Sequence, residues 1–191
     1  AGMPLIADPG FELGRAAAEA GHAVTSAPGP TAVTTALALS GLATDAFFFG
    51  GFLPSAAAAR RTRLSALAAV PGTLAFYESP KRLAAALADM AEMLGGAREA
   101  AVCRELTKKF EETLRGTLGE LRDAVAERTL KGEIVVVLDR GRDEVAEETM
   151  EAALRRAMSE MSLKDAAATV AEAYGLPRRK VYQAALELEK D

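Results

Sequence analysis

The chain has 191 residues, half of them hydrophobic and 26% charged, so it is long enough to bury a sizeable core and is not expected to be disordered. Its formal net charge of −4 excludes a general positive field and requires local basic patches for any nucleic-acid partner. One cysteine, Cys103, and one histidine, His22, exclude an intramolecular disulfide and argue against a metal site.

The first 45 residues predict part of an α/β domain. Residues 1–10 form a loop rich in glycine and proline, and periodic apolar residues predict a helix over 11–20. A strand over 23–27 and a turn at 28–30 then lead into a second helix over 31–39. Because no Met and no strand precede this loop, we expect the chain to be N-terminally truncated, with its first domain incomplete.

Residues 46–142 predict a second α/β domain. Apolar runs predict strands over 46–49, 73–77, 100–104, 111–115 and 134–138, the last of the fully buried type. Helices are expected after Ser55, which can cap the first of them, from Pro80 to about Leu94, and from Thr117, which has Glu120 at capping-box spacing. We place the boundary with the first domain in the segment 41–45.

The remaining residues, 143–191, predict a module of three helices, over about 146–160, 163–174 and 178–189. Ser162 and Asp165 resemble a capping pair, Gly175 ends the middle helix and Pro177 begins the last one. Two helices joined by Gly-Leu-Pro have the outline of a helix-turn-helix. The predicted domains are therefore 1–45, 46–142 and 143–191.

Polar side chains follow two strands of the second domain. Glu78 comes directly after the 73–77 strand, and Glu105 and Lys108 follow the 100–104 strand. Ligands bind at the carboxyl ends of strands in open α/β sheets, where helix amino ends and loop N–H groups converge. Glu78 can equally cap the next helix, and the other pair can be a solvated loop. Two such strand ends facing one crevice favour a site.

Other residue patterns point away from several functions. The sequence has no G-x-G-x-x-G, P-loop or H-E-x-x-H motif. We expect His22 to be a surface cation and Cys103, in an apolar strand, to be buried and unreactive. Without a run of 18 apolar residues or a basic-then-apolar leader, neither membrane spanning nor secretion is indicated, and the expected location is the cytoplasm.

Six short segments carry a resemblance to a known family. They are AGMPLIADPG at 1–10, PGPTA at 28–32, GFLP at 51–54, FYESP at 76–80, RELTK at 104–108 and KGEI at 131–134. In this order they resemble the family that 2′-O-methylates a decoding-centre cytidine of small-subunit ribosomal RNA, a branch of the tetrapyrrole methylases. The resemblance covers essentially the whole chain. It implies a two-domain tetrapyrrole-methylase-like α/β fold (class III methyltransferase), its first domain incomplete, followed by the helical helix-turn-helix-like module.

The resemblance further implies a homodimer that binds S-adenosylmethionine between its two α/β domains. The implied cofactor-binding residues are Ala1, Gly2, Met3, Thr31, Ala32, Tyr77, Glu78 and Leu106. An adenosyl group suits apolar walls with a few backbone donors and acceptors. The chain departs from the family in lacking the first strand and its Gly-Asn loop, and in having Ala7 where serine is common and Lys81 where histidine is common.

The implied reaction is in-line displacement at the sulfonium methyl by a ribose 2′-hydroxyl, in which alignment of the reactants supplies much of the rate. If a general base is needed, Glu105 is the first candidate and Glu78 the second, with Lys108 polarising the hydroxyl or holding a phosphate. A purely structural role for both glutamates stays open, and no metal is expected.

Two basic clusters are candidates for contact with small-subunit ribosomal RNA. They are Arg60, Arg61 and Arg63 in the second domain and Arg178, Arg179 and Lys180 in the helical module. A solvated helix face is the open alternative for each. Two other functions also stay open: methylation of a small tetrapyrrole, and a helix-turn-helix regulator, although the last helix turns apolar and acidic after its basic start.

Overall fold

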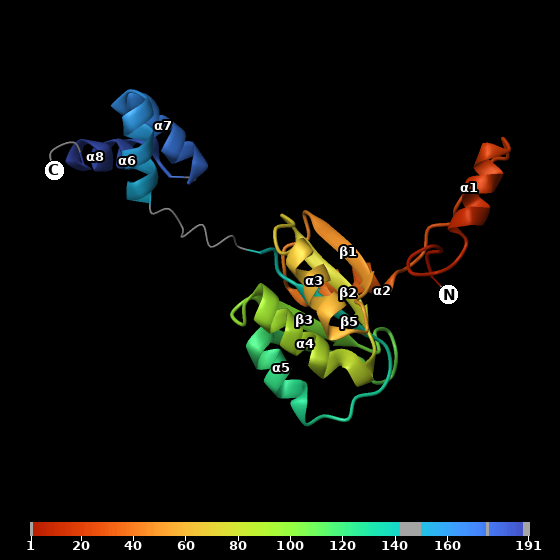
Figure 1. The fold of residues 1–191 in the computed structure, drawn as a ribbon. Coiled ribbons are helices and arrows are strands. Elements are labelled where there is room, and N and C mark those ends of the chain that lie inside the picture. The colour runs from red at the N-terminus through yellow and green to blue at the C-terminus, as the bar shows by residue number, and fades with distance from the viewer. Residues whose placement is uncertain (1, 142–149, 175, 189–191) are drawn as a thin grey trace. The chain divides into compact units, whose positions relative to one another are not determined.

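The computed structural model describes residues 2–141, 150–174 and 176–188, and the chain divides into two compact units, 1–141 and 142–191 (Figure 1). The helices of the first unit are α1 (Phe11–Glu19), α2 (Ala32–Ser40), α3 (Ala57–Leu67), α4 (Pro80–Leu94) and α5 (Leu118–Ala126). Its strands are β1 (Phe47–Phe52), β2 (Thr73–Glu78), β3 (Glu99–Arg104), β4 (Glu112–Thr117) and β5 (Ile134–Leu138).

The five strands form one mixed sheet in the order β1-β2-β5-β3-β4. β1 and β2 are parallel, whereas β5 is antiparallel to both β2 and β3, and β4 is antiparallel to β3. Strands β1, β2 and β3 therefore run in the same direction. Their carboxyl ends lie at one edge of the sheet together with the amino end of β5. This edge brings together the polar strand ends that the sequence singles out.

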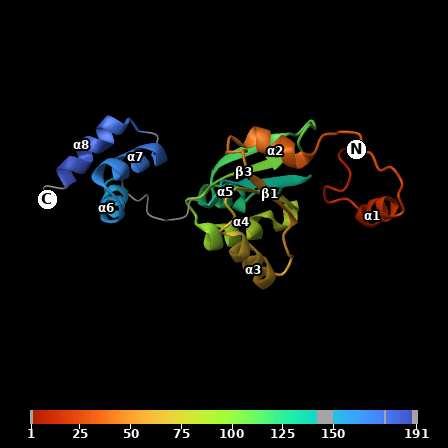
Figure 2. The ribbon, with the colours of Figure 1, turned by 90° about the horizontal axis from the view of Figure 1, so that it is seen from above.

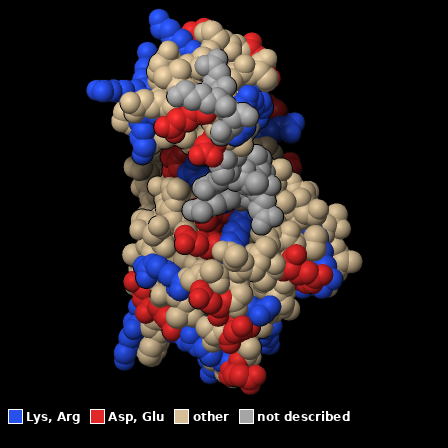
Figure 3. Space-filling model, turned by 90° about the vertical axis from the view of Figure 1, so that its left-hand side faces the viewer, with Lys and Arg blue, Asp and Glu red and all other residues tan. Residues whose placement is uncertain are grey.

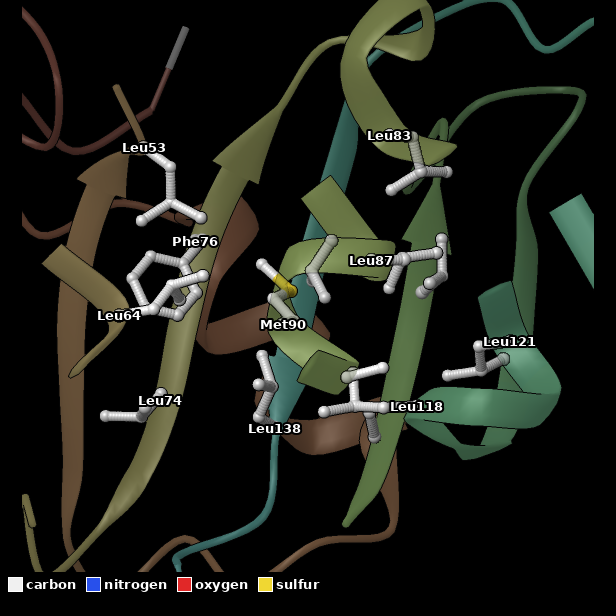
Figure 4. Close-up of a cluster of buried hydrophobic side chains, with 14 of the residues drawn as sticks. Leu53, Leu64, Leu74, Phe76, Leu83, Leu87, Met90, Leu118, Leu121 and Leu138 are labelled. Atoms are coloured by element: carbon white, nitrogen blue, oxygen red, sulfur yellow. The ribbon is translucent and has the colours of Figure 1, made fainter. Parts of the chain in front are cut away.

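The alternation of side chains along the central strands divides the core into two layers. Odd-numbered residues such as Ala75 and Val137 pack with α2, and even-numbered residues such as Phe76 and Val136 pack with α3, α4 and α5. Figure 2 shows α2 on one side of the sheet and α3 and α4 on the other. Figure 4 shows the larger layer, in which leucines from both the strands and the helices lie around Phe76 and Met90. Both faces of β5 are covered, which explains its continuous apolar run.

A buried ion pair joins two helices of the larger layer. Arg60 of α3 is 5% exposed and its Nη2 lies 2.5 Å from Asp89 Oδ2 of α4. The same guanidinium donates to the carbonyls of Pro54 and Ser55, so its charge and its donors are met within the protein. Arg61 adds a second contact to Asp89, at 2.8 Å.

The second unit is a three-helix cluster with its own core. Its helices are α6 (Met150–Glu160), α7 (Leu163–Ala173) and α8 (Arg178–Leu188). Leu154, Val170, Val181 and several alanines pack between them. Ser162 caps α7 by accepting from the backbone N–H of Asp165, as predicted. The predicted stop at Gly175 and the first residues of the first predicted helix, 146–149, lie outside the described residues.

Two local predictions were wrong. Residues 23–27 form no strand, because no strand of the described chain lies beside them to satisfy their backbone groups. Ser55 does not cap α3, whose N-cap is Ala56 without a side-chain hydrogen bond. The boundary expected at 41–45 lies within the first compact unit, in which α2 packs on the sheet of the second predicted domain.

Other predictions at single residues agree with the structure. Thr117 and Glu120 form a reciprocal capping box, and Pro80 is the first residue of α4. Cys103 is buried under α2, and burial raises the pKa of its thiol, as expected for an unreactive cysteine. Of the helices described, none has the length and apolarity to cross a membrane.

Candidate functional site

A cavity of about 510 Å³ lies at the carboxyl edge of the sheet. Its walls come from the loop 2–8, the turn before α2, the ends of β1 and β2, and the loops that flank β3 and β5. Seven of the eight cofactor-binding residues implied by the resemblance line it: Gly2, Met3, Thr31, Ala32, Tyr77, Glu78 and Leu106. Ala1 lies outside the described residues. Segments far apart in sequence thus form one ligand-sized space.

The first wall is held by backbone contacts that require glycine. The Met3 N–H donates to the Pro30 carbonyl at 2.9 Å, which fixes the first loop to the turn before α2. Gly2 has φ 141°, and a Cβ there would lie 2.9 Å from the Pro30 oxygen. A side chain at this position would push the two segments apart and open the cavity.

The second wall is the amino end of α2. Thr31 caps the helix, since its Oγ1 accepts from the Thr34 N–H at 3.1 Å, and Ala32 is the first helical residue. Free N–H groups and the positive end of the helix dipole gather at such a helix start. Ala32 has a small side chain, which leaves these groups accessible to a ligand in the cavity.

The third wall is aromatic. Tyr77 contacts Phe49 and Phe52 edge to face, with ring centroids 4.9 and 5.5 Å apart. Burial raises the pKa of the Tyr77 phenol, and the negative charge of the nearby Asp8 raises it further. This hydroxyl therefore stays protonated at neutral pH and can donate a hydrogen bond. An apolar wall with one polar tip suits a flat heterocycle.

Glu78 lines the cavity, but its carboxylate is committed to its own segment. The side chain has no exposed surface. One oxygen accepts from the Ser79 N–H at 2.7 Å, and Arg82 Nη2 donates to the other at 3.2 Å. Arg82 also donates to the Leu53 carbonyl, which ties the start of α4 to the end of β1. Both oxygens of the carboxylate thus have partners within the protein, while the residue shapes this part of the wall.

Glu105 does not line the cavity, but holds two of its loops together. Its N–H donates to the Glu133 carbonyl and its carboxylate accepts from the Glu133 N–H, both at 2.9 Å. Lys108 Nζ bridges the two carboxylates at 3.0 and 2.9 Å. The backbone bond from Glu133, and then Lys108, lower the pKa of Glu105, whereas Glu133 and Glu105 raise that of Lys108. This arrangement favours a clamp over a proton acceptor.

The backbone around Glu105 is unusual. Glu105 and Thr107 have φ values of 51° and 63°, which are rare for residues with a side chain. Gly132 faces this turn, and a Cβ on it would lie 2.3 Å from the Glu105 carboxyl carbon. The strained turn places Leu106 between the two positive-φ residues and into the cavity wall.

The chain matches known methylases over most of its length. The profile described as tetrapyrrole (corrin/porphyrin) methylases matches residues 1–122, and the one described as RsmI C-terminal HTH domain matches residues 143–189. The protein named ribosomal RNA small subunit methyltransferase I from Mycobacterium tuberculosis is 46% identical over 193 residues, covering 100% of this chain and 67% of that protein. The chain belongs to the tetrapyrrole methylase family.

Further relatives place it within one branch of this family. The protein of the same name from Pseudomonas aeruginosa is 44% identical, covering 98% of this chain and 68% of that protein. The protein of the same name from Mesorhizobium japonicum is 47% identical, and the match covers 99% of this chain and 65% of that protein. The chain spans about two thirds of the length of these curated relatives. The expected family and methyltransferase class are confirmed.

Solved structures support the expected fold class. The chain superimposes on a cobalt-precorrin-4 methyltransferase with a TM-score of 0.55 at 18% identity, over 72% of this chain and 61% of that one. A conserved hypothetical protein from Aeropyrum pernix gives a TM-score of 0.52 at 18% identity, over 100% of this chain and 68% of that one. At these identities the likeness concerns the tetrapyrrole-methylase fold alone.

The candidate RNA-binding arginines of α3 have different environments in this methylase fold. Arg60 is buried with Asp89 and cannot reach a phosphate, so its predicted role is wrong. Arg61 is half-exposed but pairs with Asp89 and Glu92. Arg63 is exposed, with its guanidinium 5.9 Å from the Phe48 ring centroid. Sequence reasoning missed the burial because Arg60 and Arg63 both lie among polar residues of one helix.

The basic cluster of the helical module is accessible. Arg178, Arg179 and Lys180 begin α8 and are exposed. On the face drawn in Figure 3, Lys and Arg are interspersed with Asp and Glu rather than gathered in one basic surface. Contacts with RNA on this face would therefore depend on local groups of cations.

Several cavity residues were not predicted. They are Ile6, Ala7, Asp8, Pro30, Phe52, Ser79, Pro80, Gly132, Glu133, Ile134 and Val135. Most lie in the same six segments that carry the family resemblance, so segment order was the available signal. Among the described residues, no group of three or more His, Cys, Asp or Glu side chains is arranged to hold a metal ion.

Proposed function

We propose that this chain binds S-adenosylmethionine and transfers its methyl group to the ribose 2′-oxygen of a cytidine in small-subunit ribosomal RNA. The observation that carries the proposal is the cavity at the carboxyl edge of the sheet, in a chain 46% identical to a ribosomal RNA small subunit methyltransferase I. Because the chain spans about two thirds of such relatives, the activity of the whole protein is proposed for it rather than assumed.

The cavity fits the methyl donor in size and chemistry. Its volume of about 510 Å³ is in the range of small-molecule sites, and its walls combine aromatic and aliphatic side chains with backbone groups. Tyr77 and Leu106 would pack on the adenosyl group, and Gly2, Met3, Thr31 and Ala32 would offer backbone contacts. When bound, S-adenosylmethionine supplies a methyl group on a positively charged sulfur, which is ready for displacement.

The role of the chain is to align the reactants and to accept one proton. Two reactants held in line gain roughly 7 to 11 kcal/mol over the same reaction in solution. The 2′-hydroxyl must lose its proton as the oxygen–carbon bond forms. Of the two candidate bases only Glu78 lines the cavity, whereas Glu105 and Lys108 would act by holding its rim. We therefore place Glu78 before Glu105 as the proton acceptor, in reverse of the order expected from sequence. To take the proton, its carboxylate would have to leave the hydrogen bond from Arg82.

The proposal also covers partners and location. Ribosomal RNA would contact Arg61, Arg63 and the start of α8, through phosphates. A homodimer and a cytoplasmic location follow from the family resemblance and from the substrate.

The test is a methyl-transfer assay on the purified chain. Small ribosomal subunits from cells that lack this methylation are incubated with S-adenosylmethionine labelled in its methyl group, and the RNA is digested to nucleosides. The expected product is labelled 2′-O-methylcytidine. Label in another nucleoside would contradict the proposed target. Label in a corrin precursor instead of RNA would favour the tetrapyrrole function, and sequence-specific duplex binding without transfer would favour a regulator.

A further inference from the structure

A second hollow lies beside the cavity and is lined by cations and an aromatic ring. It has a volume of about 410 Å³, and we call it the basic pocket. Its residues are Arg104, Phe110, Arg128, Thr129, Leu130 and Lys131. None of the candidate RNA-binding residues taken from sequence belongs to it, and the proposed methyl-donor site does not use it.

The two arginines of the basic pocket are held rigidly by one carboxylate. Glu112 is the cross-strand partner of Arg104, whose Nε lies 3.1 Å from it. Arg128 Nη2 donates to both Glu112 oxygens, at 2.8 and 2.9 Å. Arg128, and then Arg104, lower the pKa of Glu112 against the effect of burial, so this carboxylate stays ionised at neutral pH. A guanidinium fixed in this way is preorganised for an anion.

The arginines keep donors available for a ligand. In the part of the chain that the structure describes, Arg104 donates from Nε to Glu112 and from Nη1 to the Lys131 carbonyl. Arg128 donates from Nη2 to Glu112. A guanidinium has five N–H donors, so both side chains retain several. The side chains are 20% and 35% exposed. With Lys131, three cations face one carboxylate, which leaves a net positive charge suited to a phosphate.

Phe110 gives the pocket a surface for stacking. Its side chain is 63% exposed, and Lys109 Nζ lies 5.6 Å from the ring centroid. A large exposed aromatic ring beside cations is the combination with which proteins bind single-stranded nucleic acid, because every base has a flat face. An acidic peptide would use the arginines but has no need of the ring.

The basic pocket adjoins the methyl-transfer cavity. Lys131 is followed directly by Gly132 and Glu133, which line the cavity. A smaller hollow of about 260 Å³ shares Arg128, Thr129 and Leu130 with the basic pocket and Pro80 with the cavity. A chain of nucleotides can therefore run from one to the other along the 128–133 loop.

We propose that the basic pocket binds the RNA strand next to the methylated nucleotide, with Arg104 and Arg128 on a phosphate and Phe110 stacked on a base. The inference rests on the proposed function, because it takes RNA as the substrate. It names the part of the methylase surface that positions the strand.

The test measures RNA binding without catalysis. The fluorescence anisotropy of a fluorescein-labelled single-stranded RNA oligonucleotide is measured as the full chain is added, at several salt concentrations. Phe110→Ala should weaken binding about tenfold with an unchanged salt slope, because stacking is not ionic. Arg128→Gln and Lys131→Gln should each weaken binding several-fold and lower the slope by about 0.7.

Matched controls lie outside the pocket. Phe47→Ala removes an exposed ring at the amino end of β1, and Arg122→Gln removes an exposed cation of α5. Both should bind RNA as the wild type does, and all variants should keep the wild-type Tm and affinity for S-adenosylmethionine. Pocket variants that bind RNA like the controls would overturn the inference. An equal loss of affinity for RNA and for polyglutamate in Phe110→Ala would also overturn it, because a peptide has no base to stack on the ring.

Binding and turnover separate this inference from the proposed function. If the pocket variants lose RNA affinity but the wild type transfers no methyl group to RNA, the pocket stands as an RNA site and the proposed function fails. If the wild type methylates RNA and the pocket variants keep its kcat/KM and its affinity, the function stands and the pocket proposal fails.

Discussion

Glu105 and Glu133 are joined by two hydrogen bonds, both 2.9 Å long. The Glu105 N–H donates to the Glu133 carbonyl, and the Glu133 N–H donates to the Glu105 carboxylate. The pair connects the loop after β3 with the loop before β5. Leu106 in the first loop and Gly132 and Glu133 in the second line the candidate methyl-donor cavity. The carboxylate of Glu105 thus acts on the cavity through the backbone of its neighbour.

The first prediction concerns this clamp. Glu105→Ala should weaken the binding of S-adenosylmethionine several-fold, because the Glu133 N–H loses its acceptor, Lys108 keeps only Glu133, and the two loops are held together less firmly. Isothermal titration measures the affinity. Glu105→Gln, which keeps an acceptor oxygen, should retain much of it, and Glu99→Ala, at the amino end of β3, should have no effect. Wild-type affinity in Glu105→Ala would exclude the clamp.

The second prediction gives the pH dependence of the clamp. The Glu133 backbone and Lys108 lower the pKa of Glu105 below its ordinary value of 4.5. A lowered carboxyl pKa stabilises the folded state above the ordinary value, and the contribution is lost as the pH falls through the folded value. The advantage of the wild type over Glu105→Gln in free energy of unfolding, measured by urea denaturation, should therefore be constant near neutrality and shrink as the pH falls below 4.5. A gap that widens on acidification would contradict this sign.

The third prediction tests the base. Because Glu78 lines the cavity, Glu78→Gln should lower kcat about a hundredfold while the affinity for S-adenosylmethionine changes little. Single-turnover methyl transfer to small subunits measures this. Glu105→Gln should leave kcat close to that of the wild type, because Glu105 does not line the cavity. Unchanged turnover in Glu78→Gln at saturating cofactor would remove Glu78 from the mechanism, and unchanged turnover in both variants would leave positioning as the source of the rate.

The fourth prediction addresses the buried arginine. Asp89→Asn leaves the Arg60 charge without its partner in a buried place and should lower the free energy of unfolding by about 3 to 5 kcal/mol. Urea denaturation measures the loss. Glu92→Gln removes the exposed partner of Arg61 and should stay close to the wild type. Equal stability of the two variants would show that the Arg60 pair is dispensable.

The fifth prediction concerns the helical module. Replacing Arg178, Arg179 and Lys180 by glutamine should weaken binding to small ribosomal subunits and lower the salt slope by about 2 to 3. The double variant Arg155→Gln and Lys164→Gln, which neutralises other exposed cations of the module, serves as the control. If both variants bind alike at every salt concentration, the start of α8 is a solvated face.

The sequence alone determined the family and most of the helices and strands. Apolar periodicity located α4, β5 and α7, and the capping pairs at Thr117 and Ser162 were readable because they depend on residues three apart. The order of the six short segments indicated a methylase and selected seven residues that prove to line one cavity. Such features are local or linear, so a single chain displays them.

The tertiary structure alone decided what each charged residue does. Arg60 and Arg63 lie in one helix, yet α4 buries the first and leaves the second exposed. Glu78 ends β2 and Glu105 follows β3, yet only Glu78 lines the cavity, because Glu105 turns toward a backbone N–H 28 residues away. The basic pocket joins β3 to two loops. Charge and burial depend on neighbours distant in sequence, and folding alone brings them together.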